Sequence, residues 1–220
     1  MSIPRRGLTI AGIVKAALDV ADAEGFETLS MRRVAGRLGV GAMTLYSYVD
    51  SKDDLLRHVF DEVMGELIVP EPLPEDWREA ISAISRRTRD VWLEHPWLAQ
   101  SIGARTEFGP RSLRHVEQSL QAVAPLGLDV PESFRVLGVI DDYVMGYTLR
   151  RVAIGGAFAS ETDAKAWMAE MEQRFRTAIA TGEYPQLQRL LDLDWDWLGE
   201  DRFESGLAAL LDGIAARYGG

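Results

Sequence analysis

Apolar residues recur along this chain at the three- and four-residue intervals that are typical of amphipathic helices. Over residues 10–24 they form one stripe, which Thr9 can cap at the start and Gly25 can end. No Asn-Gly or Asp-Gly turn stands between alternating apolar runs, which would be the usual signature of a β-hairpin. The pattern therefore predicts an all-α protein.

Two short helices and one longer helix are predicted between residue 30 and residue 68. Ser30 caps a helix over about 31–38, which Gly39 ends, and another helix follows over about 42–48. Ser51 then opens a longer helix at the spacing of a capping box. The buried stripe of that longer helix consists of Leu55, Leu56, Val59, Phe60, Val63 and Leu67.

Three prolines at alternate positions interrupt the helical pattern at residues 69–74. We interpret this run as a stiff joint between an N-terminal domain, residues 1–68, that consists of a three-helix unit and the longer helix after it, and a larger helical domain, residues 69–220. In the larger domain, helices are expected over about 76–94, 110–124, 131–158, 160–182 and 201–217, with a short helix after Trp97 and a short or irregular segment near 186–192.

Charge is distributed unevenly along the 220 residues, whose formal net charge is −10. Residues 1–60 carry eight Lys or Arg and seven Asp or Glu, whereas the remaining residues carry 16 and 27. The acidic part would be repelled by phosphate, while the N-terminal part is free to approach it. The distribution permits binding to nucleic acid but does not require it.

Composition excludes several functional classes. The chain has no cysteine, which removes disulfides, thiolate catalysis and Cys-based zinc sites. Common enzyme motifs are missing, and the adjacent acids Asp141 and Asp142 would point about 100° apart on a helix, so we expect no enzyme and no cofactor. The three histidines show no metal spacing, so we expect no metal. No apolar run is long enough for a signal peptide or a membrane span, which predicts a cytoplasmic protein without a membrane partner.

The most informative stretch is residues 28–52, where two short helices meet at Gly39. Gly39 can adopt the left-handed conformation that folds the second helix across the first. The second helix keeps small, polar and aromatic side chains outward, namely Ala42, Met43, Thr44, Tyr46, Ser47 and Tyr48. A short helix of this kind suits the major groove of DNA, so the stretch predicts a helix-turn-helix.

This run resembles the helix-turn-helix of the TetR family over about the first 60 residues. The matching residues are Gly39-Val40, Thr44-Leu45-Tyr46-Ser47-Tyr48-Val49-Asp50-Ser51-Lys52 and Leu55-Leu56. The rest of the chain is similar to tetracycline-repressor-like C-terminal domains at the proline joint, at Leu93-Glu94-His95-Pro96 and over residues 203–213. The resemblance implies a DNA-binding transcriptional regulator, in first place a repressor that a small-molecule effector releases from a palindromic operator.

Chemistry and resemblance together suggest which residues contact the double-stranded operator. Thr44, Tyr46 and Tyr48 are expected to bind phosphates, and Lys52 to add positive charge. Arg32 is the candidate for a bidentate guanine contact. The positions that face the bases are Gly41, Ala42, Met43 and Ser47, with Ala42 and Met43 suited to thymine methyl groups. Two further arginines, Arg33 and Arg37, are expected to be solvated surface charges.

The C-terminal domain is expected to dimerise and to bind the effector. The helices over about 131–158 and 201–217 carry more apolar and small residues than one buried stripe needs, and in the family they pair with those of a second subunit. The resemblance therefore implies a homodimer. A small lipophilic or aromatic effector is expected against aromatic and methionine side chains, each of which also suits an ordinary core: Trp92, Phe108, Tyr143, Tyr147 and Met171.

The sequence departs from the tetracycline repressor in one respect. That repressor holds a magnesium-chelated drug through histidines, and the corresponding position late on the fourth helix is Ile68 here. The effector is therefore not expected to be a metal–tetracycline complex. Two other functions stay open at this point: a ligand-responsive activator, and a helical protein-interaction module that does not bind DNA.

Overall fold

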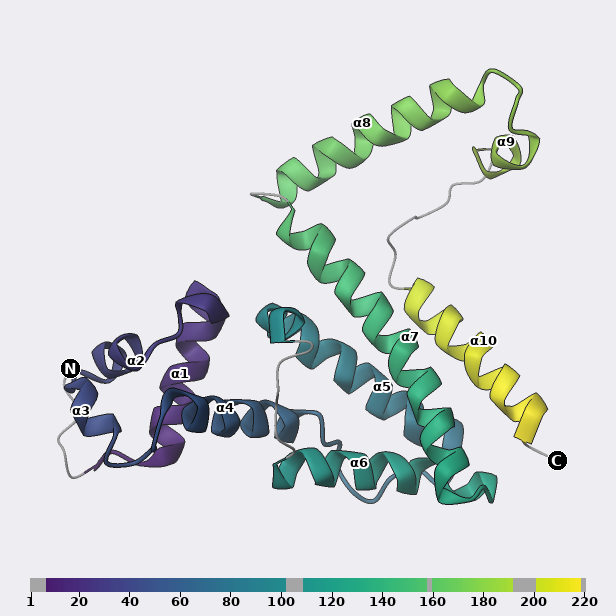
Figure 1. Ribbon diagram of the computed structural model, residues 1–220. Coiled ribbons are helices and arrows are strands. Elements are labelled where there is room, and N and C mark those ends of the chain that lie inside the picture. Colours follow the sequence, from purple (N-terminus) through teal and green to yellow (C-terminus); the bar gives the residue numbers. More distant parts are fainter. Residues whose placement is uncertain (1–6, 102–108, 158–159, 192–200, 219–220) are drawn as a thin grey trace.

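The structure is a computed structural model that describes residues 7–101, 109–157, 160–191 and 201–218, and within these ranges all regular structure is helical (Figure 1). This confirms the all-α prediction. We call residues 7–67 the head and residues 69–218 the body. No helix among the described residues has both the length and the apolar character that a membrane crossing needs.

The head consists of α1 (Ile10–Glu24), α2 (Met31–Leu38), α3 (Ala42–Leu45) and α4 (Lys52–Glu66), with a short 3-10 helix, η2 (Phe26–Thr28). The predicted caps are present: Thr9 Oγ1 accepts from Gly12 N–H at 3.1 Å, and Ser51 Oγ accepts from Asp54 N–H at 3.0 Å. Helix α3 ends at Leu45, three residues earlier than expected, because the chain continues as tighter turns in which Tyr48 N–H bonds Leu45 C=O at 2.9 Å.

The hydrophobic core of the head includes side chains of the body. Trp97 and Leu98, from the 3-10 helix η3 (Pro96–Ser101), and Val91 belong to the same buried cluster as the helices of the head. The Trp97 ring stacks on Phe26, with centroids 5.4 Å apart. The head is therefore closed on one side by the segment that ends α5 (Trp77–Glu94) and begins η3.

The proline-rich joint is fixed to the body by one buried side chain. Gln118 lies in α6 (Pro110–Val123) and has an exposed fraction of 0%. Its Oε1 accepts from the N–H of Val69 at 3.0 Å, and its Nε2 donates to the C=O of Val69 at 2.9 Å. These two bonds set the position at which the chain leaves the head.

The body packs α5, α6, α7 (Val130–Gly156) and α10 (Asp201–Tyr218) around a second core, with η4 (Ala124–Leu126) joining α6 to α7. In Figure 1, α10 lies beside α7 on the side away from the head. Helix α8 (Glu161–Ile179) projects away from α7 and leads to α9 (Pro185–Leu191). Helix α8 ends three residues before the expected Gly182, and Ile179 is its one buried residue among those whose burial is described.

Candidate DNA-binding surface and effector pocket

The turn between α2 and α3 has the conformation that the sequence predicts. Gly39 has φ 69° and ψ 28°, in the left-handed region, and its N–H bonds the carbonyl oxygens that end α2. The side chains of Leu38, Leu45 and Val49 are buried around this turn. The two short helices therefore form a helix-turn-helix whose second helix, α3, has its opposite face in solvent.

Some of the residues expected to contact DNA are exposed to solvent, and others are half-buried. Met43 is 78% exposed and Tyr46 is 46% exposed, and Arg32, Gly41, Ser47 and Lys52 are also exposed. Thr44 is half-buried. Ala42 and Tyr48, which the sequence placed outward, are half-buried and pack against the core of the head. The side chains of these two residues are therefore partly covered by protein.

Ion pairing divides the basic residues of the head into two groups. Arg33 pairs with Glu24, and Arg37 Nη2 lies 3.7 Å from Asp19 Oδ2. Arg32 and Lys52 make no ion pair or side-chain hydrogen bond with any residue in the described ranges. An exposed cation without a partner loses no protein contact when it turns to a phosphate or a base. This difference favours Arg32 over its neighbour Arg33 as a DNA contact.

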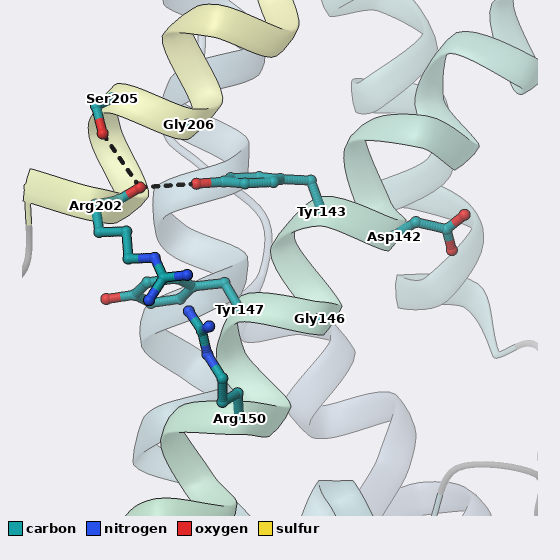
Figure 2. Close-up of a pocket in the computed structure, with 8 residues that line it drawn as sticks. All are labelled: Asp142, Tyr143, Gly146, Tyr147, Arg150, Arg202, Ser205 and Gly206. Carbon is teal, nitrogen blue, oxygen red and sulfur yellow. Dashed lines mark hydrogen bonds between the residues drawn. The ribbon is translucent and has the colours of Figure 1, made fainter. Parts of the chain in front are cut away.

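A cavity of about 580 Å³ lies between α7 and α10 (Figure 2). Its volume is in the range of pockets for drug-sized ligands, but it is largely open to solvent, and Arg150, Arg202 and Ser205 at its walls are exposed. In Figure 2 the guanidinium groups of Arg150 and Arg202 point toward the part of the cavity where Tyr147 lies, and Asp142 points away from them. The cavity is lined by Asp142, Tyr143, Gly146, Tyr147, Arg150, Arg202, Ser205 and Gly206.

Tyr143 connects the cavity to α10. Its hydroxyl donates towards the backbone carbonyl of Phe203 at 2.8 Å and lies 3.1 Å from that of Arg202. Burial, and then the neighbouring Tyr147, raises the pKa of Tyr143, so the hydroxyl keeps its proton as a donor. Tyr147 packs edge-on against Phe203, with centroids 5.0 Å apart. The aromatic side of the cavity is therefore held in place by the first turns of α10.

The structure brings together only part of the ligand set expected from the sequence. Tyr143 and Tyr147 line the cavity. Trp92 packs against the core of the head, and Met171 is 43% exposed on α8. Phe108 lies outside the described residues. Arg150 and Arg202 could not be identified from the sequence, because two exposed arginines on separate helices give no signal until the fold places them together.

A polar cluster between head and body has no counterpart among the predictions from the sequence. His95 Nδ1 lies 2.7 Å from Asp22 Oδ1, and His95 Nε2 lies 3.5 Å from Glu66 Oε2. Trp97 Nε1 donates to the same Asp22 oxygen at 2.7 Å. Potential metal-ligating atoms of Glu66, Glu94 and His95 lie within 4.8 Å of one another. Four separate elements, α1, α4, α5 and η3, supply these residues, so no local spacing in the sequence indicates the cluster.

Together, the exposed helix-turn-helix and the cavity in a separate helical body define a DNA-binding transcriptional regulator. The profile described as "Bacterial regulatory proteins, tetR family" matches residues 13–59, and that described as "Tetracyclin repressor-like, C-terminal domain" matches residues 69–218. The chain belongs to the TetR family of transcriptional regulators.

Relatives support this membership over nearly the whole chain. The HTH-type transcriptional repressor DrrR1 of Streptomyces coeruleorubidus is 37% identical over 216 residues, which are 96% of this chain and 78% of that protein. The class A tetracycline repressor from Escherichia coli is 27% identical over 93% of this chain and 89% of its own.

Solved structures show the same fold. The apo structure of ActR from Streptomyces coelicolor has a TM-score of 0.76 and 30% identity, covering 96% of this chain and 97% of that one. The complex of ActR with actinorhodin has a TM-score of 0.76 and 29% identity, covering 97% and 98%.

Proposed function

We propose that this protein is a homodimeric repressor that leaves a palindromic operator when an aromatic effector carrying an acidic group binds between α7 and α10. The observation that carries the DNA-binding part is the solvent-facing surface of α2 and α3, where Arg32 and Lys52 have no protein partner among the described residues. The function is binding rather than catalysis, at chromosomal DNA in the cytoplasm, without a membrane partner.

The two matched ranges support a division into a DNA-binding domain, residues 1–68, and a regulatory domain, residues 69–220. Within the DNA-binding domain, we assign phosphate contacts to Thr44, Tyr46, Tyr48 and Lys52. The base-reading side chain is Arg32, and the exposed Met43 offers an apolar surface to thymine methyl groups. The remaining positions against the groove are Gly41, Ala42 and Ser47.

A second copy of the chain is proposed to pack along the exposed faces of α7 and α10 beside the cavity, so that the effector site adjoins the subunit interface. On α7, Val139 is 50% exposed. On α10, Ala209, Gly213 and Ala216 form an exposed strip of small residues, which permits close approach of another helix. Two-fold pairing of these faces would place two reading helices about 34 Å apart along DNA and so require a palindromic operator.

The effector class follows from the cavity. Tyr143 and Tyr147 offer aromatic surface, and the two arginines outnumber the single acid Asp142. An aromatic ligand with a carboxylate or an ionised phenol would satisfy both features. That ActR has been solved with actinorhodin supports a small organic ligand in a body of this fold. We propose that effector binding favours a dimer whose heads no longer match successive major grooves.

The DNA-binding part is tested on operator fragments selected from random duplex DNA, with affinity measured by fluorescence anisotropy. Arg32→Ala is expected to weaken specific binding by about 1–3 kcal/mol and to relax the preference at one base pair. Lys52→Gln is expected to weaken binding to every duplex and to lower the salt slope by about 1. Arg33→Ala is the matched control, because Arg33 is occupied by Glu24.

Equal losses for Arg32→Ala and Arg33→Ala would contradict the assignment of Arg32. If the wild-type chain selects no DNA sequence, the repressor proposal fails. A reporter gene behind the selected operator then separates repression from activation. Sedimentation at micromolar concentration tests the dimer, and a monomer there would count against the pairing of α7 and α10.

A further inference from the structure

We propose that His95 is a positioning residue: in its protonated form it holds the end of α1 against the junction of α4 and α5, so that the orientation of the head depends on proton binding at this side chain. This contact joins head and body, and it needs neither the effector nor its cavity.

His95 stands where three elements meet. It is the C-cap residue of α5, its backbone N–H bonds Val91 C=O, and its exposed fraction is 9%. Asp22, near the end of α1, lies 2.7 Å from Nδ1, and Glu66, the last residue of α4, lies 3.5 Å from Nε2. A neutral imidazole donates from only one ring nitrogen, whereas the protonated ring donates from both. Only the protonated ring can therefore donate to both carboxylates at once.

The charges around His95 favour the bound proton. Asp22 from α1, Glu66 from α4 and Glu94 from α5 are acidic. Among the described residues, the cation beside these carboxylates is Arg87 of α5. Its guanidinium nitrogens lie 3.6 Å from Oε2 of Glu66 and 3.6 Å from Oε2 of Glu94. From η3 the ring meets Trp97, with centroids 6.0 Å apart. Three carboxylates face one guanidinium, so a neutral His95 leaves an excess of negative charge between head and body.

The direction of the proton linkage follows from the same contacts. Burial lowers the pKa of His95, but the hydrogen bond and charge of Asp22, and then those of Glu66, outweigh it and raise the pKa above 6.5. A group whose pKa is raised by folding stabilises the folded arrangement most below its unfolded pKa. That stabilisation is present in full below about 6.5 and is lost as the pH rises through the higher folded value.

A divalent metal ion is the other occupant to consider, because Glu66, Glu94 and His95 bring potential ligand atoms together. Arg87 argues against it, since its guanidinium pairs with both carboxylates and its Nε donates to Glu66 C=O at 2.6 Å. A metal ion would have to displace this cation. The observations therefore favour the proton, and the metal becomes an outcome of the test.

The test compares the full-length wild type with His95→Gln and Asp22→Asn. His58→Gln is the control, because it removes an exposed histidine of α4 that lies outside the cluster. The indole N–H of Trp97, which donates to Asp22, reports the contact by nitrogen-15 NMR and is assigned with Trp97→Phe. In wild type and His58→Gln this signal should titrate together with the His95 ring, with a midpoint above 6.5.

In His95→Gln the Trp97 signal should lose this titration, and in Asp22→Asn the His95 midpoint should fall. A pH-independent indole signal in wild type, or the same midpoint in Asp22→Asn, would overturn the proposal. A midpoint that moves on addition of Zn²⁺ and returns with a chelator would also overturn it, in favour of a metal site.

The positioning role is measured on the selected operator between about pH 6 and about pH 8. The ratio of wild-type to His95→Gln affinity should change about fivefold or more over this range, while the ratio to His58→Gln stays constant. A constant ratio for His95→Gln, with operator binding intact, would refute the positioning role alone. If no protein binds the operator, the repressor proposal fails, and the indole titration still decides whether the protonated contact exists.

Discussion

Replacing Gln118 with methionine is expected to loosen the joint between head and body with little change in packing. The glutamine is fully buried, and both polar ends of its amide bond the backbone of Val69, at 3.0 and 2.9 Å. Methionine has a similar volume and offers no comparable donor or acceptor. The substitution therefore removes two hydrogen bonds and leaves the N–H and C=O of Val69 without these partners.

The size of the effect follows from the burial of the two partners. A neutral hydrogen bond contributes about 1 kcal/mol net, and a fully buried unsatisfied group costs about 1–3 kcal/mol. Val69 is half-buried, so water can replace part of what is lost. We therefore expect the free energy of unfolding to fall by about 2–3 kcal/mol. Gln121→Met, at an exposed position of the same helix, is expected to change it by less than about 0.5 kcal/mol.

Equilibrium unfolding in urea measures both variants. The dependence of the unfolding free energy on urea should be unchanged, since the surface exposed on unfolding is the same. A loss below about 0.5 kcal/mol for Gln118→Met, with that dependence unchanged, would refute the reasoning that these two bonds fix the joint.

Three glycine substitutions test the cavity and the turn. A Cβ at Gly206 would lie 2.8 Å from Cζ and 2.9 Å from Cε2 of Tyr143, so Gly206→Ala should displace this ring and cost about 1–3 kcal/mol in urea unfolding. In the background of Tyr143→Ala the added methyl should cost nothing, and a cost that persists there would show that the clash lies elsewhere. Gly39→Ala should destabilise by about 1–2 kcal/mol because of its left-handed φ, whereas Gly36→Ala, in open space on α2, should stabilise by up to about 1 kcal/mol. Equal thermal shifts for these two glycine variants would contradict the conformational explanation.

Helix positions follow from local chemistry, which is why the sequence predicts so many of them. Thr9, Ser30 and Ser51 each accept a backbone N–H at the start of a helix, and Gly25 and Gly39 end the helices that they follow. The end of α3 was predicted three residues too late. The turns that follow Leu45 are hydrogen-bonded nearly as a helix would be. Whether these residues form a helix or turns depends on packing rather than on residue type.

The candidate sites could be predicted only where one segment contains them. The candidate DNA-binding surface lies on residues 31–52, and the family pattern identified it. The cavity combines residues about 60 positions apart, such as Tyr143 and Arg202, and no spacing links them. Trp92 is an aromatic residue of the kind that lines ligand pockets, but its position at the end of α5 places it against the head. Likewise, Arg33 differs from Arg32 because it pairs with Glu24, and this pairing depends on the angle between α1 and α2.

The sharing of Trp97 and Leu98 with the head has a consequence for building chimeric regulators. A recombinant fragment cut after residue 68 would leave the faces of Phe26 and Phe60 that Trp97 covers open to water. Grafting this head onto the body of a relative would require the recipient to supply an equivalent aromatic side chain and a partner for Asp22. The portable unit for engineering therefore comprises the N-terminal helices together with residues 91–98, two stretches that a single crossover point cannot transfer.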